Sequence, residues 1–266
     1  MSQPPSFLRP EMAATFEDRE VAASYRHRPA YPVQTFDVLA GLIVDEPRAV
    51  LDLGCGTGFV ARPLAPLVDR VDAVDPSSAM IEEGKQLPGG DNPRLSWIVG
   101  RAEDISLQPP YGLVTAGDSL HWMDWDVLLP RLAGVISPHG SLAILSVDGT
   151  IKTGDESLQR GIVDLIRRYS TYKEWRPDFD LVAELTRRGL FRERGRTETE
   201  AVPFRQSAGE YVESFHARAS LSWERMDPES LAAFDTALLR LVLDHVGGVI
   251  ELTVRATIVW GRPLRP

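Results

Sequence analysis

Between residues 48 and 148, short apolar stretches alternate with longer and more polar segments. The five stretches are AVLDL (49–53), RVDAV (70–74), LSWIV (95–99), GLVTAG (112–117) and SLAILSV (141–147). Strands buried on both faces of a parallel sheet have this largely apolar character, and helices or loops connect them. The pattern therefore predicts an α/β core over about residues 45–150, in which a parallel sheet is built from repeated βα units.

The pattern of apolar positions differs on both sides of this core. Residues 33–43 have a helical period, with Pro32 near its first turn. Two further strands are predicted in residues 197–206 and 250–261, and the last would add an antiparallel edge to the sheet. Four amphipathic helices are also predicted, in residues 158–169, 178–189, 208–220 and 228–245.

These elements predict the organisation of the chain. After a flexible N-terminal segment, residues 1–24, we expect a single domain over residues 25–266. Its helices within about 151–245 would cover the edge at which the parallel strands end, and its final strand would span about 250–260. Open α/β sheets bind ligands at that edge, so the helices are placed to form a lid. A lid and a passive cover have the same sequence pattern.

The composition limits the classes of partner. The chain has 266 residues, a formal net charge of −9 and one cysteine. Nucleic-acid binding depends mainly on Lys and Arg that neutralise phosphates, and a single cysteine cannot form an intrachain disulfide. No stretch reaches the roughly 18 apolar residues of a membrane-spanning helix. We therefore expect a cytoplasmic protein that acts on a small-molecule substrate. The protein is expected to bind neither nucleic acid nor a membrane, and its oligomeric state stays open.

A glycine-rich loop directly follows the first predicted strand. In LGCGTGF (53–59), Gly54, Gly56 and Gly58 allow a sharp turn and a close approach of the backbone to a ligand. The dinucleotide fingerprint has Gly or Ala at the position of Phe59, and the Gly-Lys-Ser/Thr ending of the phosphate loop is missing. A nicotinamide oxidoreductase is therefore a less favoured alternative.

Two acidic residues accompany this loop. Asp52 comes just before it, where a carboxylate repels phosphate but suits a cationic group. Asp75 ends the second strand, where an acid accepts hydrogen bonds from ribose hydroxyls in nucleotide-binding α/β folds. Without a phosphate-binding motif, the two acids describe a cationic nucleoside, and S-adenosylmethionine fits that description.

The motifs DLGCGTGF, VDAVDPSSAM and GRAEDI, which follow one another from residue 52, resemble those of the class I S-adenosylmethionine-dependent methyltransferases. The resemblance covers about residues 25–150, and YRHRPAYP (25–32) is similar to a segment of a bacterial small-molecule branch, the methyltransferase domain 11-like proteins. It implies a Rossmann-like, doubly wound sheet of seven strands, mostly parallel with an antiparallel last strand, plus helical lid insertions. It also implies S-adenosyl-L-methionine as cofactor and S-adenosyl-L-homocysteine as product.

By position, the resemblance assigns the parts of the cofactor to different loops. The methionine part would contact the glycine-rich loop, the ribose Asp75, and the adenine the residues after the second and third strands, with Glu103 or Asp104 near its amino group. Cys55 is expected to be a small side chain against the ligand instead of a reactive thiol. YRHRPAYP either closes over the methyl donor or only forms a rigid turn into a helix. The candidate cofactor residues are Tyr25, Arg28, Tyr31, Asp52, Gly54, Cys55, Gly56, Gly58, Asp75, Pro76, Ser77, Met80, Ala102, Glu103, Asp104 and Ser119.

The stretch GDSLHWMDW (117–125) begins at the end of the fourth strand and would lie beside the methyl group of the cofactor. Methyl transfer needs the acceptor atom about 3 to 3.5 Å behind the methyl carbon, and a base only where the acceptor loses a proton. His121, with an ordinary pKa of about 6.5, is a candidate base or substrate contact, or else supports the loop. Arg218 is a candidate partner of an acidic substrate, or else a surface or structural residue. The candidate substrate contacts are Trp122, Tyr172, Trp175, His216 and Arg218.

The remaining motifs favour no other chemistry. The five histidines show no metal-binding spacing, so no metal site is expected. QPPY (108–111) is similar to a motif of amino-directed DNA methyltransferases, but it precedes the fourth strand instead of following it. The favoured function is methyl transfer to an oxygen, nitrogen or carbon atom of a small molecule by in-line displacement. The alternative is a cofactor-binding protein without methyltransferase activity, in a regulatory or assembly role.

Overall fold

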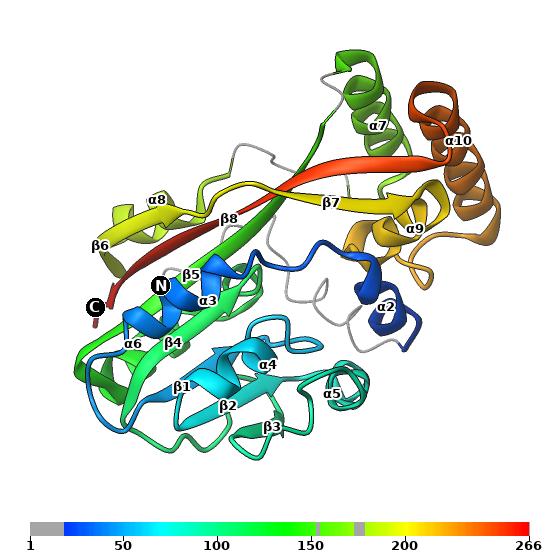
Figure 1. Cartoon of the computed structure of the whole chain (residues 1–266). Helices are drawn as coiled ribbons and strands as arrows, with labels where there is room; N and C mark the ends of the chain where they lie inside the picture. The colour runs from blue at the N-terminus through cyan, green and yellow to red at the C-terminus, as the bar shows by residue number, and fades with distance from the viewer. Residues whose placement is uncertain (1–18, 153–154, 173–178, 266) are drawn as a thin grey trace.

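The computed structural model of the protein describes residues 19–152, 155–172 and 179–265. Eight strands of these residues form one mixed sheet (Figure 1). The strands are β1 Ala49–Leu53, β2 Arg70–Asp75, β3 Leu95–Val99, β4 Tyr111–Gly117, β5 Ile136–Ile151, β6 Phe191–Glu198, β7 Val202–Ser207 and β8 Val249–Pro263. Their order is β3-β2-β1-β4-β5-β8-β6, and β7 pairs with β8 off this path.

The parallel half of the sheet consists of β1 to β5, and it confirms the five strands expected between residues 48 and 148. β5 is longer than expected at both ends. All residues of β1 are buried and alternate between two apolar clusters, since Leu51 and Leu53 belong to one and Val50 to the other. This burial on both faces is the reason for the apolar runs in the sequence.

The antiparallel half is built around β8, which pairs with β5 on one side and with both β6 and β7 on the other. The single strand expected at residues 197–206 is wrong, because two strands meet there. Between them the Thr199 amide still donates to the Ala256 carbonyl at 2.9 Å, but the Ala256 amide donates to the Thr199 hydroxyl at 3.0 Å instead of to a backbone carbonyl. The sheet therefore has eight strands instead of seven, while the mostly parallel order with an antiparallel last strand is confirmed.

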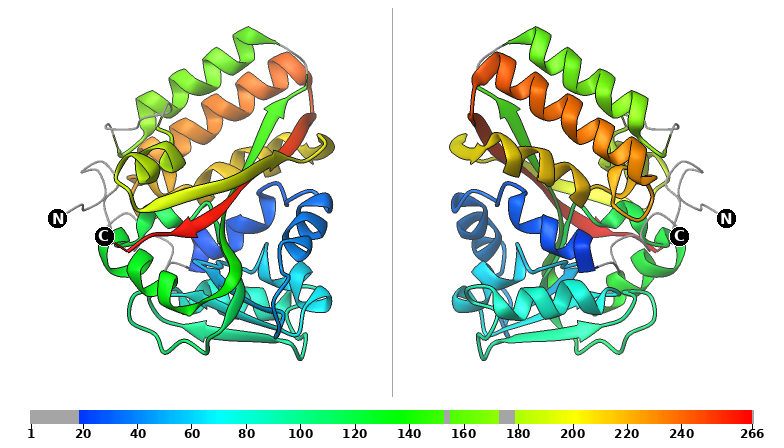
Figure 2. Two further views of the ribbon diagram at one scale, coloured as in Figure 1. Left: turned by 90° about the vertical axis from the view of Figure 1, so that its left-hand side faces the viewer. Right: turned by 90° about the vertical axis from the view of Figure 1, so that its right-hand side faces the viewer.

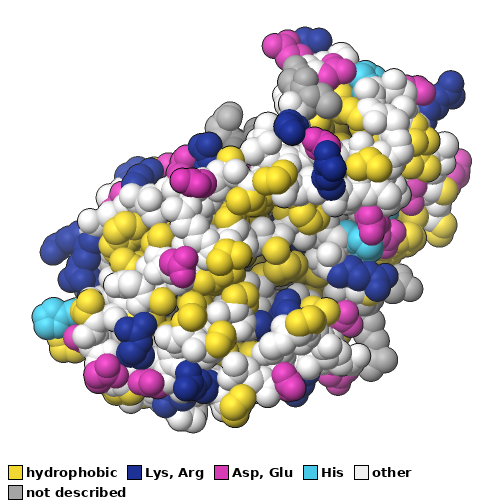
Figure 3. All heavy atoms as spheres, viewed as in Figure 1, with side chains coloured by type: hydrophobic (Ala, Val, Ile, Leu, Met, Phe, Trp, Pro, Cys, Tyr) yellow, Lys and Arg dark blue, Asp and Glu magenta, His cyan; other side chains and the backbone are white. Residues whose placement is uncertain are grey.

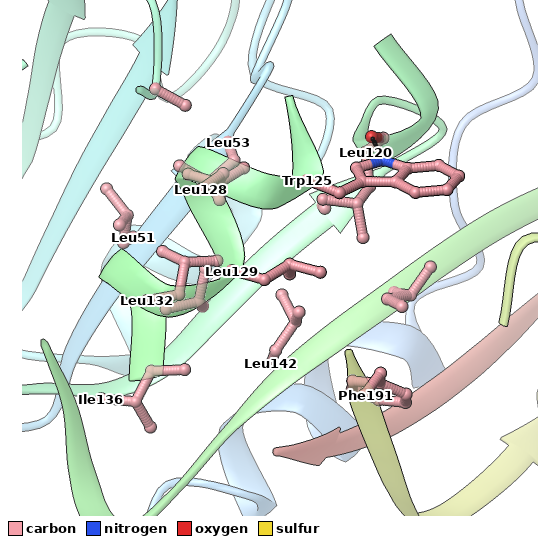
Figure 4. Close-up of a cluster of buried hydrophobic side chains, with 14 of the residues drawn as sticks. Leu51, Leu53, Leu120, Trp125, Leu128, Leu129, Leu132, Ile136, Leu142 and Phe191 are labelled. Carbon is pink, nitrogen blue, oxygen red and sulfur yellow. Dashed lines mark hydrogen bonds between the residues drawn. The ribbon is translucent and has the colours of Figure 1, made fainter. Parts of the chain in front are cut away.

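Helices cover both faces of the parallel half. The helices are α2 Arg19–Ser24, α3 Gln34–Gly41, α4 Ala61–Leu64, α5 Ser78–Gln86, α6 Trp125–Val135, α7 Glu156–Tyr169, α8 Leu181–Arg187, α9 Ala208–Glu213 and α10 Pro228–Val246, with short 3-10 turns η2 Tyr25–His27, η3 Ala65–Leu67, η4 Leu120–Trp122, η5 Ser214–Ala217 and η6 Ala219–Leu221. On one face, Leu129 and Leu132 of α6 pack toward Leu142 of β5, in a cluster that includes residues of α8 (Figure 4). On the other face, Leu39 of α3 and Leu64 of α4 are buried against the sheet.

Aspartate side chains fix the starts of four helices. Asp124, Asp155, Asp180 and Asp227 accept hydrogen bonds from amides in the first turns of α6, α7, α8 and α10. The last helix ends at Gly247, whose φ of 74° favours glycine and turns the chain into β8.

The ends of β5, β7 and β8 extend beyond the parallel half and hold α7, α9 and α10 around a separate apolar cluster (Figure 1). In Figure 2, α7 and α10 lie side by side, and they are in contact. These helices lie within about residues 151–245, for which a substrate-side cover is expected. The same range includes α8, which packs against β6 and belongs to the apolar cluster under α6. The helix expected over 208–220 ends at Glu213, and η5 and η6 follow it.

The N-terminal segment is partly structured. Residues 19–24, expected to be flexible, form α2, which packs on α5 and η5. Val21 and Ala22 are buried against Met80 of α5, and this apolar contact holds the helix in place. Residues 1–18 of the expected flexible segment lie outside the described residues.

Candidate functional site

A cavity of about 280 Å³ opens where β1, β2 and β4 end. On the face seen in Figure 3, hydrophobic side chains gather between the parallel half of the sheet and the helical end, with charges of both signs around them. Most residues that the sequence proposes for a cofactor line this cavity, together with one proposed substrate contact. They are Tyr25, Arg28, Tyr31, Asp52, Gly54, Cys55, Gly56, Asp75, Pro76, Met80, Ala102, Glu103, Ser119 and Trp122.

Three residues proposed for cofactor contact lie outside the cavity lining. Gly58 has a φ of 83°, and a Cβ there would lie 2.6 Å from the Trp97 ring, so this glycine serves the turn and its packing. Ser77 caps α5 by accepting a hydrogen bond from an amide of its first turn. Asp104 is exposed and lies 3.7 Å from Arg101. Gly58 and Ser77 therefore serve the local fold, and none of the three residues lines the cavity.

Further residues complete the lining. They are Pro29, Phe59, Val60, Val74, Gly100, Arg101, Gly117, Asp118, Met123 and Val147. Most of them flank proposed residues along the chain, and that proximity was the available signal. Val147 lacks such a signal, because only the order of the sheet brings β5 next to β4.

The glycine-rich loop lies against the exit of β4. Gly54 has a φ of 61°, and a Cβ there would lie 2.6 Å from the Ser119 Cβ. The Ser119 hydroxyl donates to the Leu53 carbonyl at 2.6 Å, which joins the ends of β1 and β4. Cys55 in this loop is buried, and burial raises the pKa of its thiol, so it packs as a small neutral side chain.

Asp75 connects the end of β2 to the loop. Its Oδ2 accepts a hydrogen bond from the Gly56 amide at 2.8 Å, and its Oδ1 accepts one from the Ser77 amide at 2.9 Å. Burial raises the pKa of this carboxyl, although the two amide bonds oppose the rise. The carboxylate therefore holds the loop in shape while it faces the cavity.

Asp52 is the most deeply buried acid of the cavity wall. Its Oδ1 accepts a hydrogen bond from the Thr115 hydroxyl at 2.7 Å. Its Oδ2 receives no hydrogen bond of normal geometry from the described residues, although the Ala61 amide is near enough to oppose the pKa shift. Burial raises the pKa of Asp52 to about 7. A buried carboxyl that is short of partners and faces a cavity is suited to a cation.

Residues of the 25–32 segment form the mouth of the cavity. Arg28 donates from Nη1 to the Tyr25 hydroxyl at 3.3 Å, and its Nη2 lies 3.8 Å from Oδ2 of Asp118. Burial raises the pKa of both Tyr25 and Tyr31, so these phenols stay neutral. Asp118 has a φ of 49°, a conformation that is uncommon outside glycine and recurs at functional sites. The segment thus contributes wall residues and is more than a turn into α3.

His121 lies in η4 beside Trp122, with their ring centroids 4.5 Å apart. Trp122 lines the cavity, whereas His121 is outside the lining. Burial, and then the positive charge of Arg28, lower the pKa of His121 to about 4. The ordinary pKa assumed from the sequence therefore does not hold, and at neutral pH this imidazole is neutral and a weak base.

The residues proposed from the helical cover are distributed differently. Arg218 is exposed and directly follows η5, which packs against η2, but it is not among the residues that line the cavity. His216 is fully buried away from it, between a backbone carbonyl at 2.8 Å and Asp235 Oδ1 at 2.9 Å. Tyr172 does not line the cavity, and Trp175 lies outside the described residues.

The remaining sequence features lie away from the cavity or indicate no further site among the described residues. QPPY lies at the start of β4, the end opposite the cavity, where the Tyr111 hydroxyl donates to Asp72 at 2.7 Å. Within the parts of the chain that the structure describes, no group of three His, Cys, Asp or Glu side chains is arranged to hold a metal ion. No helix of those parts has the length and apolar character needed to cross a membrane.

Known proteins resemble this chain in sequence and in fold. Residues 50–140 match the family model described as a methyltransferase domain. The chain is 31% identical over 158 residues to the malonyl-[acyl-carrier protein] O-methyltransferase of Halalkalibacterium halodurans, which covers 53% of this chain and 58% of that protein. It is 37% identical over 100 residues to the trans-aconitate 2-methyltransferase of Pseudomonas paraeruginosa, which covers 36% of this chain and 35% of that protein.

A solved structure shows the likeness of the fold. It comes from Anaeromyxobacter dehalogenans and is provisionally named a type II methyltransferase. It is 23% identical, and it superposes with a TM-score of 0.61 over 88% of this chain and 97% of that chain. The sequence matches thus span 58% and 35% of the two relatives, while the structural likeness extends over most of the fold.

Proposed function

We propose that the chain is a class I S-adenosylmethionine-dependent methyltransferase, which transfers a methyl group from S-adenosylmethionine to an oxygen, nitrogen or carbon atom of a small-molecule acceptor. When bound, this cofactor supplies a methyl group that the positive charge of its sulfonium has already activated. The observation that carries the proposal is the buried, under-partnered carboxyl of Asp52 at the glycine-lined end of the cavity. The trans-aconitate methyltransferase among the relatives supports a small acceptor.

The end of the cavity at Asp52 suits the ammonium group of the cofactor. An ammonium beside Oδ2 would supply the missing hydrogen bond and would favour the ionised carboxylate, which burial now disfavours. A phosphate at the same place would be repelled by that charge, and this disfavours a nicotinamide dinucleotide.

The nucleoside part would lie between β2 and the loop after β3. Each oxygen of Asp75 uses one lone pair on a backbone amide and keeps another for a ribose hydroxyl. Pro76, Met80 and Ala102 line the cavity there and would form apolar walls for the adenine. Glu103, fixed by a hydrogen bond from a backbone amide at 2.8 Å, would accept one from the adenine amino group.

The mouth of the cavity would hold the acceptor. Tyr31, Trp122 and Met123 line it and would exclude water from the reacting atoms. Methyl transfer depends mainly on in-line positioning, so a strong base is not required. Where an acceptor must lose a proton, Asp118 is better placed than His121, because it lines the cavity and burial raises its pKa.

Calorimetric titrations with S-adenosylhomocysteine and with NAD test this function. Binding of S-adenosylhomocysteine with no response to NAD is expected, and the opposite result would overturn the proposal. Incubation with labelled methyl donor and a panel of small acids, amines and phenols then tests the chemistry. Cofactor binding without transfer to any acceptor would favour the cofactor-binding alternative.

A further inference from the structure

Two arginines from distant parts of the sequence stand together at the mouth of the cavity. Arg28 directly follows η2, and Arg218 directly follows η5. These two turns pack against each other, so the two arginines follow adjacent turns. Arg28 lines the cavity, and its positive charge reaches Arg218 strongly enough to lower the pKa of that guanidinium.

Arg218 has no counterion. Among residues 19–152, 155–172 and 179–265 its guanidinium makes no hydrogen bond or ion pair, and it lies over the Phe215 ring at 4.3 Å from the centroid. Desolvation and the positive charge of Arg28 lower the pKa of Arg218, and Tyr211 raises it. No carboxylate contributes to this shift. The residue is exposed, so a ligand in solvent can reach its side chain.

The surroundings of Arg28 hold little negative charge that could offset the two arginines. Its nearest carboxylate is Asp118, at 3.8 Å, and its other polar contact is the neutral Tyr25 hydroxyl at 3.3 Å. Among the described residues, one carboxylate therefore stands against two guanidiniums, and it pairs with Arg28 alone, in a protein whose net charge is −9. Like charges held close together in a recess repel each other, and a bound anion removes that cost.

We propose that Arg218, together with Arg28, binds an oxyanion of the acceptor substrate, a carboxylate or a phosphate. The planar guanidinium fork pairs with either group through two parallel hydrogen bonds, which a lysine does not reproduce. The inference rests on the proposed function, because an anion at the mouth would place the rest of the acceptor toward Asp118 and Trp122 in the cavity. It gives the substrate class of that site as an organic acid or a phosphate ester.

Anion binding by variants of Arg218 tests the proposal without a known acceptor. Tricarballylate and inorganic phosphate are titrated, each against sodium chloride at equal ionic strength, into wild type, Arg218→Gln and Arg240→Gln. Arg240 is an exposed arginine of α10 that lies 3.8 Å from Asp244 and outside the cavity lining, and it serves as the control. The readouts are melting temperature and calorimetric affinity, both with and without S-adenosylhomocysteine.

Wild type and Arg240→Gln should bind at least one of the two anions, and Arg218→Gln should bind it about tenfold or more weakly, the scale of losing hydrogen bonds to a charged group. Arg218→Lys should fall between them. The stronger of the two responses distinguishes a carboxylate from a phosphate.

Equal responses of wild type and Arg218→Gln, or no response of wild type beyond that to chloride, would overturn the inference. The affinity for S-adenosylhomocysteine, measured in the same samples, should stay within about twofold in Arg218→Gln, because this residue lies outside the cavity lining. If wild type did not bind S-adenosylhomocysteine, this would instead contradict the proposed function. The anion titrations of the ligand-free protein would still test the inference.

Discussion

Asp75 accepts a hydrogen bond from the Gly56 amide at 2.8 Å, so the carboxylate proposed to bind the ribose also holds the glycine-rich loop. Its second oxygen accepts from the Ser77 amide at the start of α5. One acid therefore joins the loop after β1 to the turn after β2. The shape of the cavity and its proposed ribose contact depend on the same side chain.

Replacement of this acid, Asp75→Ala, is expected to weaken the binding of S-adenosylhomocysteine by about 1 to 3 kcal/mol, the scale of losing hydrogen bonds to a charged group. The melting temperature should also fall, because two loop amides lose their acceptor. Asp91→Ala, in an exposed loop, is the control for removal of a carboxylate. Calorimetry measures the affinities, and an unchanged affinity of Asp75→Ala would rule out the ribose assignment.

The pH dependence of cofactor binding should report the carboxyl of Asp52. Its pKa of about 7 means that it is half protonated near neutrality in the ligand-free protein. An ammonium pairs only with the ionised form, so affinity for S-adenosylhomocysteine should fall below pH 7, by up to about tenfold per pH unit. Asp52→Asn should bind weakly and with a flatter pH profile between pH 5 and 7.

Unfolding experiments provide a second readout of the same group. Because the folded pKa lies above the unfolded value of 3.8, its contribution to stability is fully present below about pH 4 and is lost as the pH rises through about 7. The slope from this one group is at most about 1.4 kcal/mol per pH unit. Equal slopes for wild type and Asp52→Asn in urea unfolding would show that the carboxyl is not perturbed.

His121 should not set the pH optimum of the reaction. With a pKa lowered to about 4, it stays neutral over the range in which an ordinary histidine titrates. At saturating cofactor, kcat of His121→Gln should therefore have the same pH profile as wild type between pH 5.5 and 8. A wild-type loss of activity near pH 6.5 that disappears in His121→Gln would instead identify this residue as the base.

His216 should stabilise the helical end of the protein in its charged form. Burial alone would lower the pKa of His216, but hydrogen bonds to Asp235 and to the Leu221 carbonyl raise it, and both partners only accept. Its contribution is therefore fully present below the ordinary pKa and is lost as the pH rises through the raised one. Asp235→Ala should cost about 1 to 3 kcal/mol of unfolding free energy at pH 6.

Asp244→Asn, an exposed change on the same helix, is the control for this pair. Urea unfolding between pH 6 and 8.5 should show a pH-dependent difference between wild type and Asp235→Ala. A difference that stays constant over that range would mean that His216 is neutral in the folded protein.

Substitution of Gly54, in the loop after β1, should lower both stability and cofactor affinity. Gly54 combines a φ of 61° with a Cβ position 2.6 Å from that of Ser119, so Gly54→Ala should cost about 1 to 3 kcal/mol and weaken cofactor binding. Gly41→Ala, at the end of α3 with open space around it, should instead be neutral or stabilising by up to about 1 kcal/mol. Thermal unfolding compares the two, and equal effects would contradict the strained loop.

Most of the parallel half of the sheet could be predicted from the sequence because β1, β2 and β4 are buried on both faces and are therefore apolar runs. β6 could not, since FRERGRTE alternates partly buried with exposed positions and lacks such a run. The break at Thr199 depends on a side-chain contact to β8, which no local pattern shows. The sequence therefore predicts which strands are buried, but it does not predict how β6 and β7 pair with β8 at the edge of the sheet.

The same division applies to the candidate site. Asp52, the glycines and Asp75 lie in short motifs, and the structure brings most of those motif residues to one cavity. The positive φ of Asp118 and the lowered pKa of His121 result from tertiary packing, the second partly through Arg28. The meeting of Arg28 with Arg218 likewise needs the packing of η2 on η5. The sequence could thus name motif residues and single candidates such as Trp122 and Arg218, but it could not show which of the candidates meet at the site.

A structure of the protein with bound S-adenosylhomocysteine tests the central claim most directly. It should place the ammonium group of the ligand beside Asp52 and the ribose hydroxyls at Asp75. The sulfur should face the mouth between Asp118 and Trp122. A ligand bound outside this cavity, or bound in it with the nucleoside at Asp52 and no contact to Asp75, would contradict the account.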